Sequence, residues 1–266
     1  MKDCTLIPDT GLRSGFAYPL LHDQGDKTFS SHFSNQVITG GTDEAGMHQE
    51  LTDLVSMVYG QNATATFLAT RLYRYFVSDN ITTEIETDII APLATTLISS
   101  DYDLFAATKQ LLKSEHFYDR DDSDNSDNII GGLIKSHTQL ITELINSADV
   151  AFPDAATDPQ GTYVDTILTF IGGFYYGGIG HYPFLPDEVA GYPAYYQAPD
   201  YQKNWFNSTS MITRYRMMEY MSRPDTGIMP IYLDVIDFLE NTAVVTDKTD
   251  ATTVVNELTD FFYPEG

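Results

Sequence analysis

The chain has 266 residues, enough for one large domain or two small ones, and it carries 14 Lys and Arg residues against 38 Asp and Glu residues, a net charge of −24. Apolar residues make up 42% and charged residues 20%, which is ordinary globular usage and excludes a disordered or fibrous chain. A surface this negative repels nucleic-acid phosphates and anionic lipids, so we expect no nucleic-acid partner. We also expect no membrane span, because no run of about 18 apolar residues is present.

The beginning of the sequence leaves the cellular compartment open. A single cysteine, Cys4, cannot form a disulfide within the chain, so the hydrophobic core must carry the stability. The first residues, MKDCTLIPDTGLRSG, contain no apolar run of the length that a signal peptide needs.

The first elements in chain order are a hairpin and a helix. Residues 13–39 combine aromatic and β-branched residues around Gly25 and Asp26, a pattern that predicts a β-hairpin with its turn at this pair. From Thr42 the apolar spacing becomes helical and continues to Gly60. One face of this predicted helix carries four apolar side chains, Leu51, Leu54, Val55 and Val58.

The next predicted helix covers residues 63–77 and has a broad apolar stripe. We expect Phe67, Leu72 and Phe76 in this stripe to be core residues. Thr83 and Glu86 then match a capping box, and Pro92 predicts a kink or two short helices after it. Another helix is predicted to start at Asp101 or Asp103.

Residues 119–128, DRDDSDNSDN, form a predicted acidic loop. Its carboxylates are oxygen ligands of the kind that calcium prefers, but the spacing fails the EF-hand pattern, since the sixth and twelfth positions counted from Asp122 are Asp127 and Leu133. A solvated loop and a weak calcium site therefore both remain open, and we expect no other cofactor. The candidate calcium ligands are Asp119, Asp121, Asp122, Asp124 and Asp127.

The second half of the chain predicts further helices. Helical spacing resumes at residues 133–145 and again at 163–176, where Gly177 and Gly178 are expected to end the helix. Three more helices are predicted near residues 208–222, 230–241 and 250–262. The fold class is therefore mainly α: an irregular multi-helix domain over residues 1–266 with a small N-terminal β-hairpin.

Between these helices, residues 179–206 form an aromatic and proline-rich segment. Aromatic rings with polar tips suit the recognition of a sugar or a peptide, but the same rings would also serve to cover the helical core. Both interpretations stay open. The candidate ligand-binding rings are Tyr192, Tyr195, Tyr196 and Trp205.

Two further groups carry chemistry. His22 and Asp23 either fix the predicted hairpin turn or form a proton-transfer pair at the mouth of a pocket. Arg74 and Arg214 lie beside apolar stripes, where they either pair with internal carboxylates or bind an anionic ligand. The histidine spacing fits no zinc-binding helix motif, and no serine nucleophile motif is present.

Several strings together resemble one bacterial family. They are HDQGDKTF from residue 22, TATFLATRLYRYFV from residue 64, LLKSEHFYD from residue 111, IKS from residue 134, and VAGYP followed by NWFNSTSMITR. In this order they resemble the family named domain of unknown function 1800, from about residue 11 to about residue 263. Departures from the family pattern are Tyr192 in place of a tryptophan after VAG, His137 in place of a proline after IKS, and the acidic insertion.

The resemblance implies an exported protein of the periplasm or cell surface, mainly helical, and often encoded beside a companion that resembles sulfatases and phosphatases. It also implies that this chain is a fragment or a shortened member of a longer family. It supplies no reaction. We therefore expect a binding or accessory module that holds a polysaccharide, a peptide or a companion exported protein through its aromatic segment. The alternative is a hydrolase that uses carboxylates with His22 and Asp23, with or without a metal.

Overall fold

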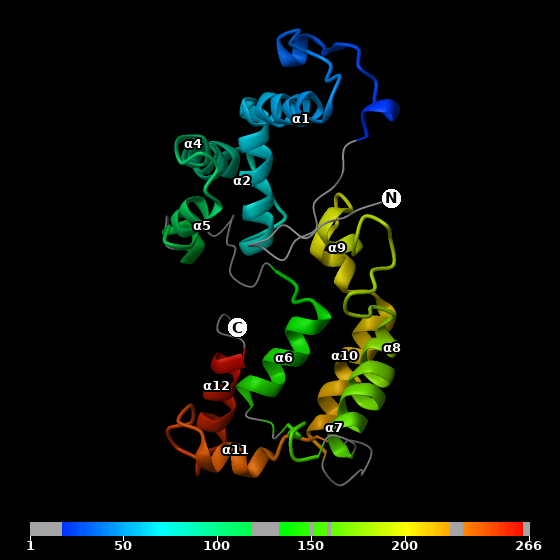
Figure 1. Cartoon of the computed structure of the whole chain (residues 1–266). Coiled ribbons are helices and arrows are strands. Elements are labelled where there is room, and N and C mark those ends of the chain that lie inside the picture. Colours follow the sequence, from blue (N-terminus) through cyan, green and yellow to red (C-terminus); the bar gives the residue numbers. More distant parts are fainter. Residues whose placement is uncertain are drawn as a thin grey trace. The chain divides into compact units, whose positions relative to one another are not determined.

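The computed structural model describes residues 18–118, 133–148, 150, 152–158, 161–223 and 231–262 (Figure 1). The chain divides into two compact units, each described here by itself. Unit 1 comprises Met1–Tyr75 and Asn80–Phe117, and unit 2 comprises Phe76–Asp79 and Tyr118–Gly266. The elements are helices apart from one two-stranded antiparallel sheet and isolated bridges, so the predicted mainly α class with a small hairpin is confirmed. The expectation of one domain over residues 1–266 stays a prediction.

Unit 1 begins with the hairpin and continues with helices. Its first elements are η1 (Pro19–Leu21), β1 (Lys27–Thr28), η2 (Ser31–Phe33), β2 (Val37–Ile38), α1 (Glu44–Tyr59) and α2 (Asn62–Phe76). Then follow α3 (Thr83–Ile85), the π-helical turn η3 (Glu86–Ile90), α4 (Ala91–Ser99), α5 (Leu104–Leu112) and η4 (His116–Tyr118). The last residues of α2 and η4 belong to unit 2.

The hairpin lies within the predicted range, but its connection is not where the sequence placed it. Lys27 pairs with Ile38 and Thr28 with Val37, so the turn between the strands contains η2 rather than Gly25 and Asp26. Ser34 and Asn35 close this turn with positive φ angles of 57° and 52°. The Gly25 segment instead forms the bend that precedes β1.

Helix α1 begins and ends where its sequence signals predict. The Asp43 side chain accepts a hydrogen bond from the Gly46 N–H group, and Gly60 follows the last turn. Its apolar stripe does not enter the core, however: Leu51 and Val55 are 58% and 46% exposed, and Met57 is the buried residue of this helix.

Helix α2 faces the core with a different stripe from the predicted one. Its buried residues are Ala65, Ala69 and Tyr73, spaced four apart. Phe67 is 58% exposed, so its assignment to the core is wrong, and Leu72 and Phe76 are only half-buried. The buried face thus consists of two alanines and one tyrosine, and the larger apolar side chains lie beside it.

One local signal in unit 1 also needs correction. The residue that caps α3 is Thr82, whose hydroxyl accepts a hydrogen bond from the Ile85 N–H group, rather than Thr83 in a capping box. Around Pro92 the chain forms the short elements α3, η3 and α4, and Pro92 lies in the first turn of α4 directly after the π-helical turn η3. The start of α5 at Asp103 is as predicted.

Unit 2 consists of α6 (His137–Ser147), α7 (Thr162–Val164), the π-helical segment η5 (Asp165–Tyr176), α8 (Gly177–Ile179), α9 (Pro193–Tyr196), η6 (Tyr201–Trp205), α10 (Ser208–Met221), α11 (Val235–Asn241) and α12 (Ala251–Phe262). The run from α7 to α8 lies alongside α10 (Figure 1). The hydrophobic core of unit 2 is formed by side chains of α6, η5, α8 and α10. They include Ile141, Phe170, Tyr175, Ile179, Met217 and Met221.

The helix that contains η5 continues through Gly177 and Gly178, so the prediction that these glycines end it is wrong. It ends at Gly180, which has a φ of +81°. Gly178 instead serves close packing: a Cβ atom there would lie 3.2 Å from the side chain of Thr213 on α10. The Thr213 hydroxyl donates a hydrogen bond to the Gly178 carbonyl at 3.3 Å.

In the ranges that the structure describes, none of the helices has the length and the apolar character needed to cross a membrane.

Candidate functional site

The aromatic segment is organised around one buried ring in unit 2. Trp205 is 6% exposed and contacts four other rings. The centroid distances are 5.4 Å to His137, 5.7 Å to His181, 5.6 Å to Tyr192 and 5.5 Å to Tyr195. We call these five residues the ring cluster. The structure thus brings together three of the four predicted ring residues.

Separate elements position the members of the ring cluster. His137 is the first residue of α6, where Ser136 and Gln139 form a reciprocal capping box. His181 follows Gly180, whose left-handed backbone turns the chain out of α8. Trp205 ends η6, two residues before the α10 cap residue Asn207.

The tyrosines of this segment differ in their surroundings. The Tyr192 hydroxyl donates a hydrogen bond to the Tyr182 carbonyl, which ties the two ends of the intervening loop together. Tyr195 and Tyr196 are 46% and 37% exposed, so both present surface to solvent. The predicted core-covering role fits Trp205, whereas the predicted recognition role fits the exposed tyrosines.

A short loop, residues 182–191, projects apolar side chains from the ring cluster, and we call it the tip loop. Bridges pair Tyr182 with Leu185 and Glu188 with Gly191, which keeps both of its turns tight. Phe184 is fully exposed at 100%, with a φ of 62°, and Leu185 is 67% exposed. Val189 is also fully exposed. The tip loop lies within the predicted aromatic segment, but its apolar side chains were not among the predicted ligand-binding residues.

His137 is a functional candidate that sequence reasoning missed. It is 2% exposed, and its Nδ1 atom accepts a hydrogen bond of 3.2 Å from Nε of Arg214. Burial, together with the charge of Arg214 and the neighbouring His181, lowers the pKa of His137 to about 3, so the ring is neutral at physiological pH. The only sequence signal was the histidine that stands in place of a proline after IKS.

His181 is the histidine that neighbours His137, and its Nδ1 atom lies 3.3 Å from Oδ2 of Asp187. The ring centroids of His137 and His181 are 5.2 Å apart. His181 was not among the predicted site residues, and its ring neighbours His137 and Trp205 lie on other elements.

The two predicted arginines belong to different units. Arg214 on α10 joins the ring cluster through His137, and its pKa is lowered by burial. Arg74 is half-buried in the last turn of α2, in unit 1.

In unit 1, the two residues of the predicted pair, His22 and Asp23, have different hydrogen-bond partners. Nε2 of His22 is hydrogen-bonded to Oε2 of Glu50 at 2.8 Å, and the Asp23 carboxylate accepts a hydrogen bond from the Gly25 N–H group at 3.0 Å. Glu50 also accepts from Lys27 Nζ and from the Gly41 N–H group. This arrangement fits the structural role of the HDQGDKTF string, which joins the hairpin to α1.

The hydrogen bonds from Lys27, Gly41 and His22 lower the pKa of Glu50 to about 2. A carboxylate whose pKa is lower in the folded than in the unfolded chain adds stability above its unfolded pKa of about 4.3, and this stability is lost as the pH falls toward its folded pKa. We expect Glu50→Gln to lower the melting temperature at pH 7, and we expect the difference from wild type to shrink progressively between about pH 5 and pH 2. Thermal unfolding followed by circular dichroism across this range measures it.

The matched control for this experiment is Asp53→Asn on the same helix, whose carboxylate accepts one exposed hydrogen bond from Gln49. A melting-temperature difference for Glu50→Gln that stays constant from pH 6 to pH 2.5 would contradict the assigned role of the Glu50 charge.

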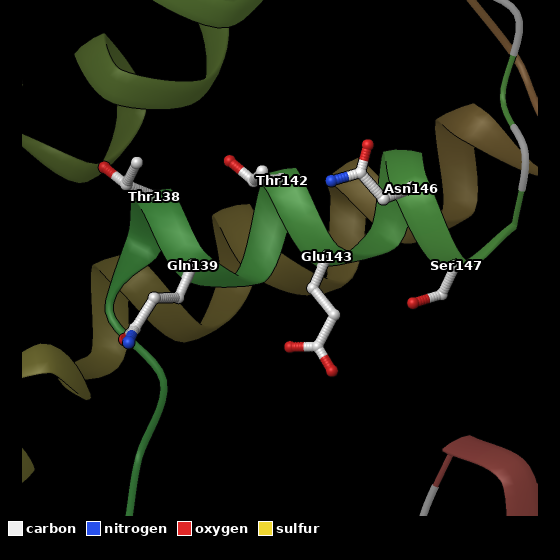
Figure 2. A pocket seen from close by; sticks show the side chains of 6 residues that line it. All are labelled: Thr138, Gln139, Thr142, Glu143, Asn146 and Ser147. Carbon is white, nitrogen blue, oxygen red and sulfur yellow. The ribbon is translucent and has the colours of Figure 1, made fainter. Parts of the chain in front are cut away.

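A shallow pocket of about 450 Å³ lies along α6 and is lined by polar side chains. Figure 2 shows two rows on this helix, Thr138, Thr142 and Asn146 in one and Gln139, Glu143 and Ser147 in the other. Partners within the protein already engage several of them: Tyr176 donates to Thr138, Gln139 caps α6, and Glu143 pairs with Lys135. Thr142, Asn146 and Ser147 complete the polar lining.

The five candidate calcium ligands, Asp119, Asp121, Asp122, Asp124 and Asp127, lie outside the described residues. Within the described ranges, no group of three or more His, Cys, Asp and Glu side chains is arranged to hold a metal ion. The calcium hypothesis stays a prediction.

Comparison with known proteins places the chain in a family. No curated protein and no solved structure matches it. The family described as "Protein of unknown function (DUF1800)" matches residues 10–265, which is nearly the whole chain. The chain therefore belongs to the DUF1800 family.

Proposed function

We infer that this chain is an exported or surface-associated binding module that holds a partner protein through the tip loop and the ring cluster below it. The observation that carries the proposal is the full exposure of Phe184 and Val189 at the tip of a loop whose base is anchored on buried Trp205. Large apolar side chains that lie fully in water are unfavourable unless a partner covers them, and exposed apolar groups of this kind are typical of interaction sites.

The chemistry of the tip loop favours a protein over a polysaccharide. Sugar recognition uses flat aromatic faces, whereas Leu185 and Val189 are aliphatic and suit insertion into an apolar pocket. Tyr195 and Tyr196, which follow the tip loop in the sequence and are partly exposed, carry hydroxyl groups that can provide polar contacts.

The partner we propose is the sulfatase-like exported companion that the family resemblance implies as a neighbour in the genome. The same resemblance supports export to the periplasm or cell surface. The hydrolase hypothesis stays a prediction, and the separate partners of His22 and Asp23 give it no added support.

The double variant Phe184→Ser with Val189→Ser tests the proposal. We expect its dissociation constant for the purified companion protein to rise by about 30-fold or more, because anchor residues of this kind contribute on the order of 2 kcal/mol to binding. The melting temperature should stay within about 2 °C of wild type, since both side chains are already in water. Biolayer interferometry and thermal unfolding measure the two quantities.

The matched control is Leu168→Ser, an apolar residue of η5 in the same unit that is 66% exposed. It should bind the companion like wild type. Unchanged binding by the double variant, or an equal loss in Leu168→Ser, would contradict the tip loop as the binding surface. Binding to insoluble polysaccharide that depends on Tyr195 and Tyr196 would replace the protein partner with a sugar polymer.

A further inference from the structure

Arg214 makes two hydrogen bonds through one edge of its guanidinium group. Nε donates to Nδ1 of His137 at 3.2 Å, and Nη2 donates to the Lys135 carbonyl at 2.5 Å. The guanidinium carbon lies 5.8 Å from the centroid of the Phe206 ring, a cation–π contact. These contacts occupy the Nε side of the planar group and leave Nη1 and the second hydrogen of Nη2 for another partner.

The charge of Arg214 is not neutralised by the protein where the structure describes it. No carboxylate lies within 4.0 Å of its nitrogens in the described ranges, although Lys27, Lys135, Lys203 and Arg223 each have one. A half-buried cation without a counter-ion is costly, and burial accordingly lowers the pKa of Arg214.

His137 positions the guanidinium and can do so only as a neutral ring. An arginine always donates, so the Nδ1 atom that faces it must carry a lone pair, and the proton of the neutral imidazole is on Nε2. Burial of His137 disfavours a second proton, which would break this contact. The Nε2 atom is itself buried and has no hydrogen-bond partner among the residues described.

We propose that the remaining edge of Arg214 binds a ligand carboxylate in a bidentate manner, with the organic part of the ligand against the exposed face of Phe206. The planar fork of arginine matches a carboxylate, and Phe206 is 46% exposed beside it. A monoanion is favoured over a phosphate dianion, because the net charge of −24 repels the second charge more strongly. This inference involves other atoms than the tip loop and does not depend on a protein partner.

The carboxylate has two plausible sources, a peptide C-terminus and an acidic sugar, and the probes separate them. N-acetyl-phenylalanine and its amide differ only in the carboxylate, as do glucuronic acid and glucose at the same position. Titration of the wild-type protein, followed at the Arg214 Nε–H resonance by NMR, should show binding of an acid and not of its neutral counterpart. Preference for N-acetyl-phenylalanine assigns a peptide C-terminus, and preference for glucuronic acid assigns an acidic sugar.

Variants of Arg214 test whether the guanidinium group binds the carboxylate through two hydrogen bonds. Arg214→Lys keeps the charge but loses bidentate geometry, and we expect it to weaken binding of the preferred acid about tenfold or more, as Arg214→Gln should. The control is Arg216→Gln, an exposed arginine on the same helix, which should bind like wild type. Because the acid and amide comparison uses wild-type protein, it tests the proposal even where an Arg214 variant does not fold.

Two variants of His137 test its positioning role. Asparagine places an amide oxygen near the Nδ1 position, so His137→Asn should keep the contact with Arg214 and bind the acid within about threefold of wild type. Glutamine places its amide near Nε2 instead, so His137→Gln should weaken binding about tenfold. The reverse order would show that Nε2–H contacts the ligand and would overturn the positioning role.

Three results would overturn the carboxylate site itself. They are equal binding of the acids and their neutral counterparts, tighter binding of inorganic phosphate than of either acid, and a loss in Arg216→Gln that equals the loss in Arg214→Gln.

Discussion

Trp205→Ala is expected to lower the free energy of unfolding of unit 2 by about 3–5 kcal/mol, the usual cost of removing a buried large aromatic side chain. The Trp205 ring is 6% exposed and contacts four rings from other parts of unit 2, so the neighbours cannot close the space that its removal leaves. Urea denaturation followed by circular dichroism measures the effect. Circular dichroism is needed because this is the only tryptophan of the chain and the variant has no tryptophan fluorescence.

The control for this variant is Phe184→Ala in the same unit. Phe184 is fully exposed, so we expect its removal to change the unfolding free energy by less than about 0.5 kcal/mol. Trp205→Phe should recover part of the loss because it restores a ring. Equal stability of Trp205→Ala and wild type would show that the ring cluster does not hold the aromatic segment.

Leu97→Ala is expected to destabilise unit 1 by about 2–5 kcal/mol. Leu97 lies in α4 and is completely buried, so the substitution removes apolar contacts and leaves a cavity in a packed core. Denaturant unfolding followed by circular dichroism gives the difference.

The next residue along α4 supplies the matched control. Ile98 is 48% exposed, and Ile98→Ala should cost less than about 1 kcal/mol. If both substitutions cost the same, the orientation of α4 in unit 1 is wrong. Together the pair therefore tests which face of the helix is buried rather than only whether the helix exists.

The sequence by itself determined most helix boundaries, because these depend on local hydrogen bonding. Asp43 caps α1, Asp103 caps α5 and Asn207 caps α10, each by accepting a backbone N–H group a few residues later. Local sequence rules predicted the end of a helix less accurately where more than one neighbouring residue could act as the capping or terminating residue. Thr82 rather than Thr83 caps α3, and Gly180 rather than Gly177 ends α8.

The face that each helix buries was decided by tertiary structure. Periodicity identifies an apolar stripe, but a neighbouring element selects which side it covers. Helix α2 is buried through Ala65, Ala69 and Tyr73, which left Phe67 exposed, and the apolar stripe of α1 that includes Leu51 is exposed as well.

In the candidate sites, too, some residues could be predicted from the sequence and others only from the tertiary structure. Composition and aromatic spacing identified Tyr192, Tyr195 and Trp205, which lie within 14 residues of one another in the sequence. The neighbouring His137 was not identified, and the residue that it hydrogen-bonds, Arg214, is 77 positions away in the sequence. In unit 1, Glu50 is likewise 28 positions from its partner His22. Contacts between residues so far apart leave no local sequence pattern, because they form only when the packed chain brings the side chains together. The burial and the neighbouring charges that set the pKa of each group arise in the same way.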